Sequence, residues 1–147
     1  MASNLPVALV AMSTVFTKII DGEIPGRFIY RDETVAAFLT IEPVAYGHTL
    51  VVPVEPVDKW TDLSPELWAH LNEVAQAVGQ AVIEVFGTER AGYLIAGFEV
   101  PHTHIHVFPA DDMSGYDLSR AIPAGETDDE KMDAAQRNLS RAVEGKL

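Results

Sequence analysis

The sequence predicts an α+β fold, in which an antiparallel sheet of about five strands packs against one long core helix, with a short N-terminal helix and a C-terminal helix. Short runs rich in β-branched and aromatic residues recur between turn residues, which is typical of strands. From Leu67 to Val85 the apolar residues follow a helical period, which is typical of a helix that buries one face. We therefore expect the helices to lie largely on one face of the sheet.

The first half of the chain is expected to supply the short helix and three of the strands. The helix is predicted over residues 13–20, capped by Ser13 or Thr14 and ended by Gly22 and Pro25. The strands are predicted at 28–30, 35–39, 48–54, 93–96 and 103–108, with a turn at 32–33 between the first two.

The two remaining helices have recognisable ends. Ser64 is expected to cap the long helix, Pro65 to be its first residue, and Gly87 to follow its last turn. Thr127 is expected to cap a polar C-terminal helix. Acidic residues in the first turn of that helix, 128–130, favour the positive end of the helix dipole.

The chain of 147 residues is long enough for one domain with a substantial core. We expect a disordered N-terminal extension at residues 1–11, a main domain at 12–112 and a C-terminal segment at 113–147 that contains the polar helix. No basic residue precedes the apolar stretch at 5–11, whereas a signal peptide needs one. A cytoplasmic protein is therefore expected.

Composition argues against several classes of function. The hydrophobic content is 48%, yet no apolar run approaches the roughly 18 residues of a membrane span. A formal net charge of -12 argues against nucleic acid as a partner, because its phosphates require basic patches. The chain has no cysteine, which excludes disulfides and thiolate zinc sites.

The most informative motif is a row of histidines at every second position, His102, His104 and His106. Alternate side chains of a strand share one face, so the three imidazoles are expected on one side of a strand. Histidine has the side-chain pKa nearest to neutrality. The row is therefore a candidate for proton transfer, nucleophilic attack or metal binding.

Two other interpretations of this row stay open. The outer Cα atoms of such a row lie roughly 13 Å apart, so three imidazoles converge poorly on one zinc ion. A pair of them with an outside ligand such as His48 could bind a metal. A surface run of histidines is the second alternative, but Pro101 and Pro109 bracket the segment as if it were a buried strand.

Residues 102–108 match the pattern His-φ-His-φ-His-φ-φ, where φ is apolar, except that Thr103 is polar. This pattern is the motif of the histidine triad (HIT) family, which the chain resembles. The family's opening segment and central strands resemble residues 13–25, 35–43 and 47–53, so that the resemblance covers about 13–110. The chain is most similar to the nucleoside phosphoramidase branch, and the resemblance implies a HIT domain at 12–112.

The resemblance implies a role for each histidine. His104 would be the nucleophile that forms a nucleotidylated histidine, a covalent intermediate that divides one substitution into two steps. His106 would contact the phosphate, and His102 would orient the nucleophile. His48 matches a fourth family histidine near the phosphate; its alternative is a buried structural histidine bonded to a carbonyl.

The resemblance also implies a nucleoside pocket. The positions that match the family's apolar purine-binding residues are Val15, Phe16, Ile19, Phe38 and Ile41. Each could instead be a core residue, most plainly Phe38 and Ile41. Thr40 stands where the family often has an aspartate that holds both ribose hydroxyls, and threonine cannot provide that bidentate contact.

The loop before the histidines departs from the phosphoramidase pattern. Phe98 and Glu99 stand where that branch has a glutamine and a hydroxyl residue that contact the phosphate and the leaving group. Glu99 could act as a proton donor, or it could be a solvated loop acid. Thr14 and Thr17 stand where many relatives have two cysteines that help to bind zinc, so no metal or other cofactor is expected.

We therefore expect a hydrolase or transferase that acts on nucleoside 5′-monophosphate derivatives, with a purine nucleotide as the substrate. The alternatives are a dinucleoside polyphosphate hydrolase of the same family, a nucleotide-binding protein with little catalysis, and a histidine-based metal-binding module. A homodimer is expected through residues 64–97. The long helix carries an apolar stripe that looks too wide for one sheet to cover, and the strand after it would leave an open edge.

Overall fold

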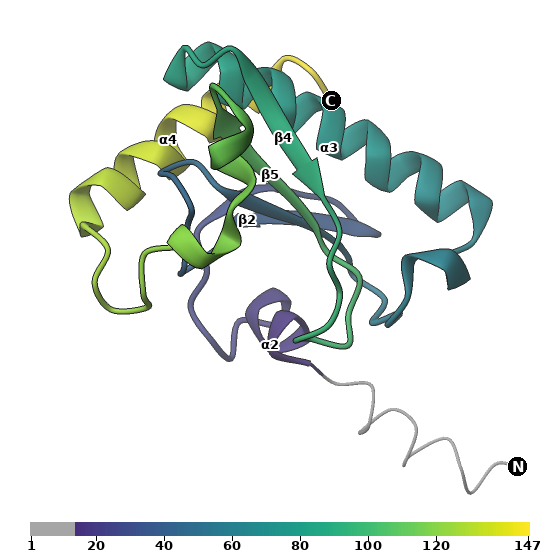
Figure 1. Cartoon of the computed structure of the whole chain (residues 1–147). Helices are drawn as coiled ribbons and strands as arrows, with labels where there is room; N and C mark the ends of the chain where they lie inside the picture. The colour runs from purple at the N-terminus through teal and green to yellow at the C-terminus, as the bar shows by residue number, and fades with distance from the viewer. Residues whose placement is uncertain (1–13) are drawn as a thin grey trace, which may run out of the picture.

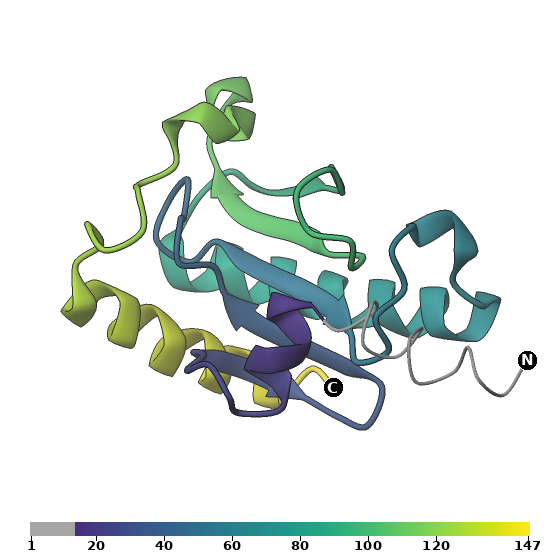
Figure 2. The same ribbon diagram turned by 90° about the horizontal axis from the view of Figure 1, so that it is seen from below.

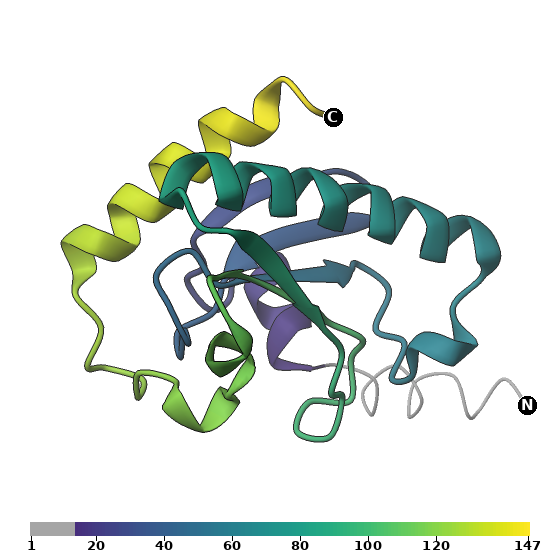
Figure 3. The same ribbon diagram turned by 45° about the horizontal axis from the view of Figure 1, so that its top comes forward.

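The computed structural model describes residues 14–147, so the extension expected at residues 1–11 and the possible cap Ser13 lie outside the described residues. Two helices, α3 and α4, cover one face of a single sheet, and the short α2 lies against the other (Figures 1 and 3). The helices are α2 (Val15–Ile20), α3 (Pro65–Phe86) and α4 (Asp129–Glu144). The strands are β1 (Phe28–Arg31), β2 (Val35–Leu39), β3 (Thr49–Pro53), β4 (Arg90–Leu94) and β5 (Ile105–Ala110).

The five strands lie in the order β1-β2-β3-β5-β4, and every neighbouring pair is antiparallel. This arrangement confirms the predicted fold class. Short 3-10 helices lie at Trp60–Asp62, Met113–Tyr116 and Leu118–Arg120. The last two belong to the connection from β5 to α4, which projects beyond the sheet (Figure 2). None of the helices within residues 14–147 has the length and apolar character needed to cross a bilayer.

Strand β5 begins at Ile105, two residues later than predicted, so His102 and His104 precede the strand. The neighbouring β3 ends at Pro53, which has no N–H to continue the ladder. The N–H of Thr103 donates instead to the carbonyl of Val57, at 2.7 Å. The chain is therefore extended here but held by partners outside the sheet.

Strand β4 was predicted at 93–96 and is found at Arg90–Leu94. Its first residues are not typical of a strand, and Gly92 lies opposite Phe108, whose ring would collide with any added Cβ. Gly97 follows with a φ of 75°, a conformation that turns the chain away from the sheet. Close packing against β5, rather than local composition, therefore defines this strand.

The ends of the long helix match the prediction, whereas the cap of the last helix lies one residue later. The Ser64 hydroxyl accepts the N–H of Leu67, and Gly87 has a left-handed φ of 66°. Asp128, not Thr127, caps α4, and its carboxylate accepts the N–H of Lys131 at 3.1 Å. A carboxylate at this position satisfies an amide and also interacts favourably with the helix dipole.

The sheet and α4 together cover the apolar stripe of α3, so the part that one sheet was expected to leave uncovered needs no second subunit. The buried residues of α3 are Leu71, Val74, Ala75, Ala77, Val78, Ala81 and Val82. They share a core with the sheet and with four residues of α4, Met132, Ala135, Leu139 and Val143. The C-terminal helix thus closes the side of α3 that the sheet does not reach.

His70, which the sequence gave no reason to single out, links α3 to the β1–β2 turn. Its Nε2 lies 2.6 Å from Asp32 and its Nδ1 lies 3.0 Å from Glu73. Since a carboxylate accepts, an imidazolium that donates from both nitrogens satisfies this geometry. The bond to Asp32 raises the pKa of His70, burial opposes this, and the Glu73 bond adds to it. Tyr30 donates to the same Asp32 oxygen at 2.6 Å.

We predict that His70→Gln lowers the free energy of unfolding by about 1 kcal/mol at about pH 5.5, the scale of a partly exposed ion pair. Because the folded-state pKa of His70 is raised above 6.5, its contribution is complete below that value and is lost as the pH rises through the raised pKa. Urea unfolding of wild type and variant at about pH 5.5 and about pH 9 checks this. An equal loss at both pH values would contradict it.

Candidate active site

The four histidines that were predicted to form the site lie together on the α2 face of the sheet. His102 and His104 come from the segment that leads into β5, His106 lies in β5, and His48 directly precedes β3. The rings of His104 and His106 are 5.0 Å apart, and those of His48 and His106 are 5.2 Å apart. The sequence therefore identified the cluster, although only one of its members lies within the strand.

His102 is completely buried and has partners on both ring nitrogens. Its Nε2 lies 2.7 Å from the carbonyl oxygen of Pro53 and its Nδ1 lies 2.7 Å from the hydroxyl of Thr14. Because a carbonyl only accepts, Nε2 carries a proton. Because both ring nitrogens are engaged, the His102 side chain has no free nitrogen to offer a substrate.

His104 has the geometry of a nucleophile. Its Nδ1 lies 2.6 Å from the backbone carbonyl oxygen of His102, so Nδ1 carries the proton and donates. In the neutral ring the lone pair is then on Nε2, which forms no hydrogen bond to any of residues 14–147. The ring packs edge-on against Phe16, with centroids 4.9 Å apart.

His48 and His106 form a pair whose proton positions are also fixed. The N–H of Val44 donates to Nδ1 of His48 at 3.1 Å, so in the neutral ring Nε2 of His48 holds the proton. That Nε2 lies 2.9 Å from Nδ1 of His106, which must accept. Neutral His106 therefore has its proton on Nε2, as a donor. Gly47, with a φ of 101°, lets the chain turn into His48 beside the Phe86 ring.

Burial keeps these imidazoles neutral. It lowers the pKa of His48 to about 3 and that of His106 to about 4, with positive charge on neighbouring histidines as a second cause. Burial also lowers the pKa of His102, against the bond to Pro53. For His104 burial again lowers the pKa, while the bond to the His102 carbonyl and the negative charge of Glu99 oppose it.

The predicted nucleoside-binding residues divide into two groups. Phe16 and Phe38 are buried and share a core cluster on this face, against which Ile19 packs. Phe38 packs edge-on against Phe16 and is buried, so it can stabilise Phe16 but cannot itself contact a ligand. By contrast, Val15 and Ile41 are exposed, Ile41 to 61%, and are free to contact a ligand.

Thr40 lies between β2 and the turn that leads to His48. Its hydroxyl accepts the N–H of Glu42 at 3.2 Å, and its own N–H donates to the carbonyl of His48. The hydroxyl therefore stabilises the turn and has one proton left to donate. A single hydroxyl proton can contact one ribose oxygen, whereas a carboxylate could contact two hydroxyls.

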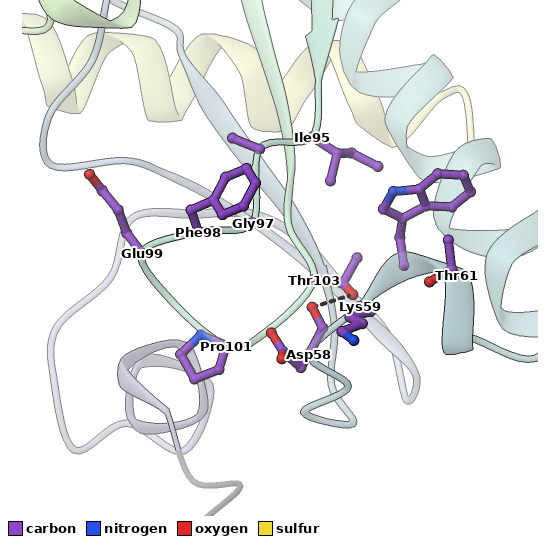
Figure 4. A pocket seen from close by; sticks show the side chains of 11 residues that line it. Asp58, Lys59, Thr61, Ile95, Gly97, Phe98, Glu99, Pro101 and Thr103 are labelled. Carbon is purple, nitrogen blue, oxygen red and sulfur yellow. Dashed lines mark hydrogen bonds between the residues drawn. The ribbon is translucent and has the colours of Figure 1, made fainter.

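Most residues of the loop over 95–101 line a pocket of about 460 Å³. Figure 4 shows Phe98 and Glu99 on this loop and Lys59 and Thr61 across the pocket. Thr103 also lines the pocket, and its hydroxyl donates to the carbonyl of Val57 at 2.8 Å. Phe98 is 97% exposed, and Glu99 is close enough to influence the charge of His104.

The residues at this site do not fit a structural zinc ion. Thr14 and Thr17 offer hydroxyls rather than thiolates, and the Thr14 hydroxyl is already bonded to His102. The Nδ1 atoms of His48 and His106 are engaged by hydrogen bonds. Within residues 14–147 no group of three or more His, Cys, Asp or Glu residues is arranged to hold a metal.

Sequence reasoning missed two residues of this site, Thr14 and Pro53. Thr14 was predicted as a possible cap of the first helix, and it does cap α2, but the contact of its hydroxyl with His102 was not predicted. Pro53 contributes a backbone carbonyl, which has no signal in a sequence. The row of alternate histidines indicated the cluster but not the groups that hold it.

Comparison with known proteins agrees with this geometry. The HIT domain family matches residues 21–113 of the chain. A Saccharomyces cerevisiae protein, adenosine 5′-monophosphoramidase HNT1, is 32% identical over 133 residues, which cover 89% of this chain and 83% of the yeast protein. A Schizosaccharomyces pombe protein, asymmetrical bis(5′-nucleosyl)-tetraphosphatase, is 33% identical over 63% of this chain and 55% of its own length.

The fold is also that of solved structures. A zinc-bound histidine triad family protein from Mycobacterium smegmatis superposes with a TM-score of 0.73 at 30% identity, and the match covers 90% of this chain and 94% of that one. The match covers more of the chain than residues 21–113, the segment that the domain family matches.

We predict that His48 and His106 stay neutral between about pH 8 and about pH 6. Midpoints near 3 for His48 and 4 for His106 are expected in a site-resolved NMR titration, with His70 as the internal control that titrates above 6.5. Because these two pKa values are lowered, their contribution to stability is present above 6.5 and is lost as the pH falls toward them. A midpoint of His48 or His106 at or above 6.5 would refute the geometry of the pair.

Proposed function

Because the chain belongs to the HIT family, we propose that it is an enzyme of the hydrolase kind that acts on nucleoside 5′-monophosphate derivatives, such as AMP phosphoramidates. A purine nucleotide is the proposed substrate, the cytoplasm is the proposed location, and no metal takes part. The observation that carries the proposal is the bond from Nδ1 of His104 to the His102 carbonyl, which leaves the lone pair on Nε2.

The reaction proceeds through a nucleotidylated His104. The Nε2 lone pair forms a bond to the α-phosphorus while the bond from phosphorus to the leaving nitrogen breaks; that nitrogen keeps the electron pair and takes up a proton. In the second step a water oxygen attacks the same phosphorus and loses a proton to solvent. The His104–phosphorus bond breaks, the electron pair returns to Nε2, and a nucleoside 5′-monophosphate is released.

Neighbouring groups stabilise the charges that develop. The His104 ring becomes positive when Nε2 is nucleotidylated, and the His102 carbonyl and the Glu99 carboxylate both favour that charge. His106 has an Nε2 proton to donate to a phosphoryl oxygen, because its Nδ1 accepts from His48. Val15, Ile41 and Thr40 are proposed to contact the nucleoside.

Dinucleoside polyphosphates are the second candidate substrates, because the Schizosaccharomyces pombe relative is named for that activity. The charge near the nucleophile favours the phosphoramidate. Glu99 would repel a polyphosphate leaving group, whereas it would attract an amine that leaves as a cation. The chain's net charge of -12 acts in the same direction.

We predict that His104→Asn reduces turnover of adenosine 5′-phosphoramidate by several orders of magnitude, as loss of a nucleophile does. Asparagine retains an N–H that can donate to the His102 carbonyl but has no lone pair at the position of Nε2. Intact mass spectrometry after rapid acid quenching is expected to find an adenylyl adduct on the wild-type chain and none on the variant.

His70→Gln is the control, because His70 lies on α3 away from the cluster, and it is expected to form the adduct normally. Wild-type turnover in His104→Asn would disprove the covalent route. Binding of AMP without any adduct or turnover in wild type would favour a nucleotide-binding protein instead. A loss of turnover with a chelator, restored by zinc, would favour the metal-dependent alternative.

We also propose that the chain forms a homodimer through residues 64–97. Within residues 14–147 no strand pairs with the outer edge of β4, although the N–H of Tyr93 donates to the hydroxyl of Tyr116 at 3.3 Å, and an edge without a partner strand promotes association. A groove of about 660 Å³ lies beside this edge, between α3 and β4, and Tyr93 is exposed there. Two copies of β4 related by a two-fold axis would form one continuous sheet.

We predict that light scattering at micromolar concentration gives the mass of two chains. Gly92→Pro is not a suitable probe, because Gly92 contacts Phe108 within the chain. Tyr93→Lys adds charge to the proposed interface and is expected to favour monomers. A single-chain mass for wild type would refute the dimer.

A further inference from the structure

Thr14 joins the N-terminal helix to the buried histidine of the site. Its hydroxyl lies 2.7 Å from Nδ1 of His102, and this is a bond between residues 88 positions apart. The same oxygen accepts the N–H of Thr17 at 3.2 Å and so caps α2. Both Thr14 and His102 are buried, so water does not readily replace either partner.

The direction of the Thr14 bond follows from the other partners. Nε2 of His102 donates to the carbonyl of Pro53, so Nδ1 of the neutral ring has a lone pair and must accept. The hydroxyl of Thr14 therefore donates its single proton to Nδ1, while its lone pairs remain for the amide of Thr17. The Thr17 hydroxyl, at 3.3 Å from that of Thr14, is the longer and weaker contact.

On the basis of the function proposed above, we propose that Thr14 is a positioning residue for the nucleophile: its hydroxyl holds the ring of His102, and the carbonyl of His102 in turn holds His104. The chain of contacts consists of three bonds, from Thr14 to Nδ1 of His102, from Nε2 of His102 to Pro53, and from Nδ1 of His104 to the His102 carbonyl. The first two fix the His102 ring at both ends, and the third transmits its position to the reacting ring.

The same residue connects substrate binding with catalysis. Helix α2 begins directly after Thr14 and carries Val15 and Phe16, and Phe16 packs against the rings of both His102 and His104. A shift of α2 would therefore move the proposed nucleoside contact and the support of the nucleophile together. Misplacement of a reacting group by about 1 Å can cost about a hundredfold in rate.

Three substitutions test this inference. Thr14→Val keeps the shape but removes the donor, and we expect kcat for adenosine 5′-phosphoramidate to fall roughly tenfold to hundredfold with little change in KM. Thr14→Ser keeps the hydroxyl and is expected to restore kcat. Thr17→Val is the matched control: it removes a hydroxyl from the same helix that does not contact His102, and kcat is expected to stay near that of wild type.

A second measurement does not depend on activity. The ¹⁵N resonance of His102 Nδ1 reports the hydrogen bond to its lone pair, and it is expected to shift in Thr14→Val but not in Thr14→Ser or Thr17→Val. The inference is overturned if Thr14→Val keeps both the wild-type kcat and the wild-type Nδ1 resonance. Absence of turnover in the wild type together with the expected Nδ1 shift would refute the proposed function and leave the contact intact.

Discussion

The site depends on one backbone carbonyl, that of His102. It accepts the Nδ1 proton of His104 at 2.6 Å, and this single bond determines which nitrogen of the reacting ring has a lone pair. Were the proton on Nε2 instead, the ring would present a donor where the proposed chemistry needs a nucleophile. The carbonyl is held in place because the His102 side chain is buried and bonded at both ring nitrogens, to Thr14 and to Pro53.

Hydrogen bonds to the backbone also determine the tautomers of the His48–His106 pair. A backbone amide can only donate, so the N–H of Val44 forces the neutral ring of His48 to carry its proton on the other nitrogen, and the order continues into His106. Burial then prevents protonation, which would break this order, by lowering the pKa of both rings. The fixed tautomers and the low pKa values of His48 and His106 thus have the same structural origin: the two rings are buried, and the backbone N–H of Val44 sets the order of their hydrogen bonds.

The sequence was sufficient for the fold class, the histidine cluster and the ends of α3, because these depend on local patterns such as alternation, helical period and capping. It was insufficient where the structure depends on contacts between residues that are far apart in the sequence. The later start of β5 follows from Pro53, the coverage of α3 follows from α4, and the contact of His70 follows from Asp32 in the β1–β2 turn. Thr14 is the same kind of case, since its partner lies 88 positions away.

Neutron diffraction from crystals of the wild-type protein grown near neutral pH would test the central claim most directly, because it locates the hydrogens that define each tautomer. The account predicts deuterium on Nδ1 of His104 and none on its Nε2, with deuterium on Nε2 of both His48 and His106. Deuterium on Nε2 of His104 would contradict it, since that ring would then have no lone pair with which to attack phosphorus.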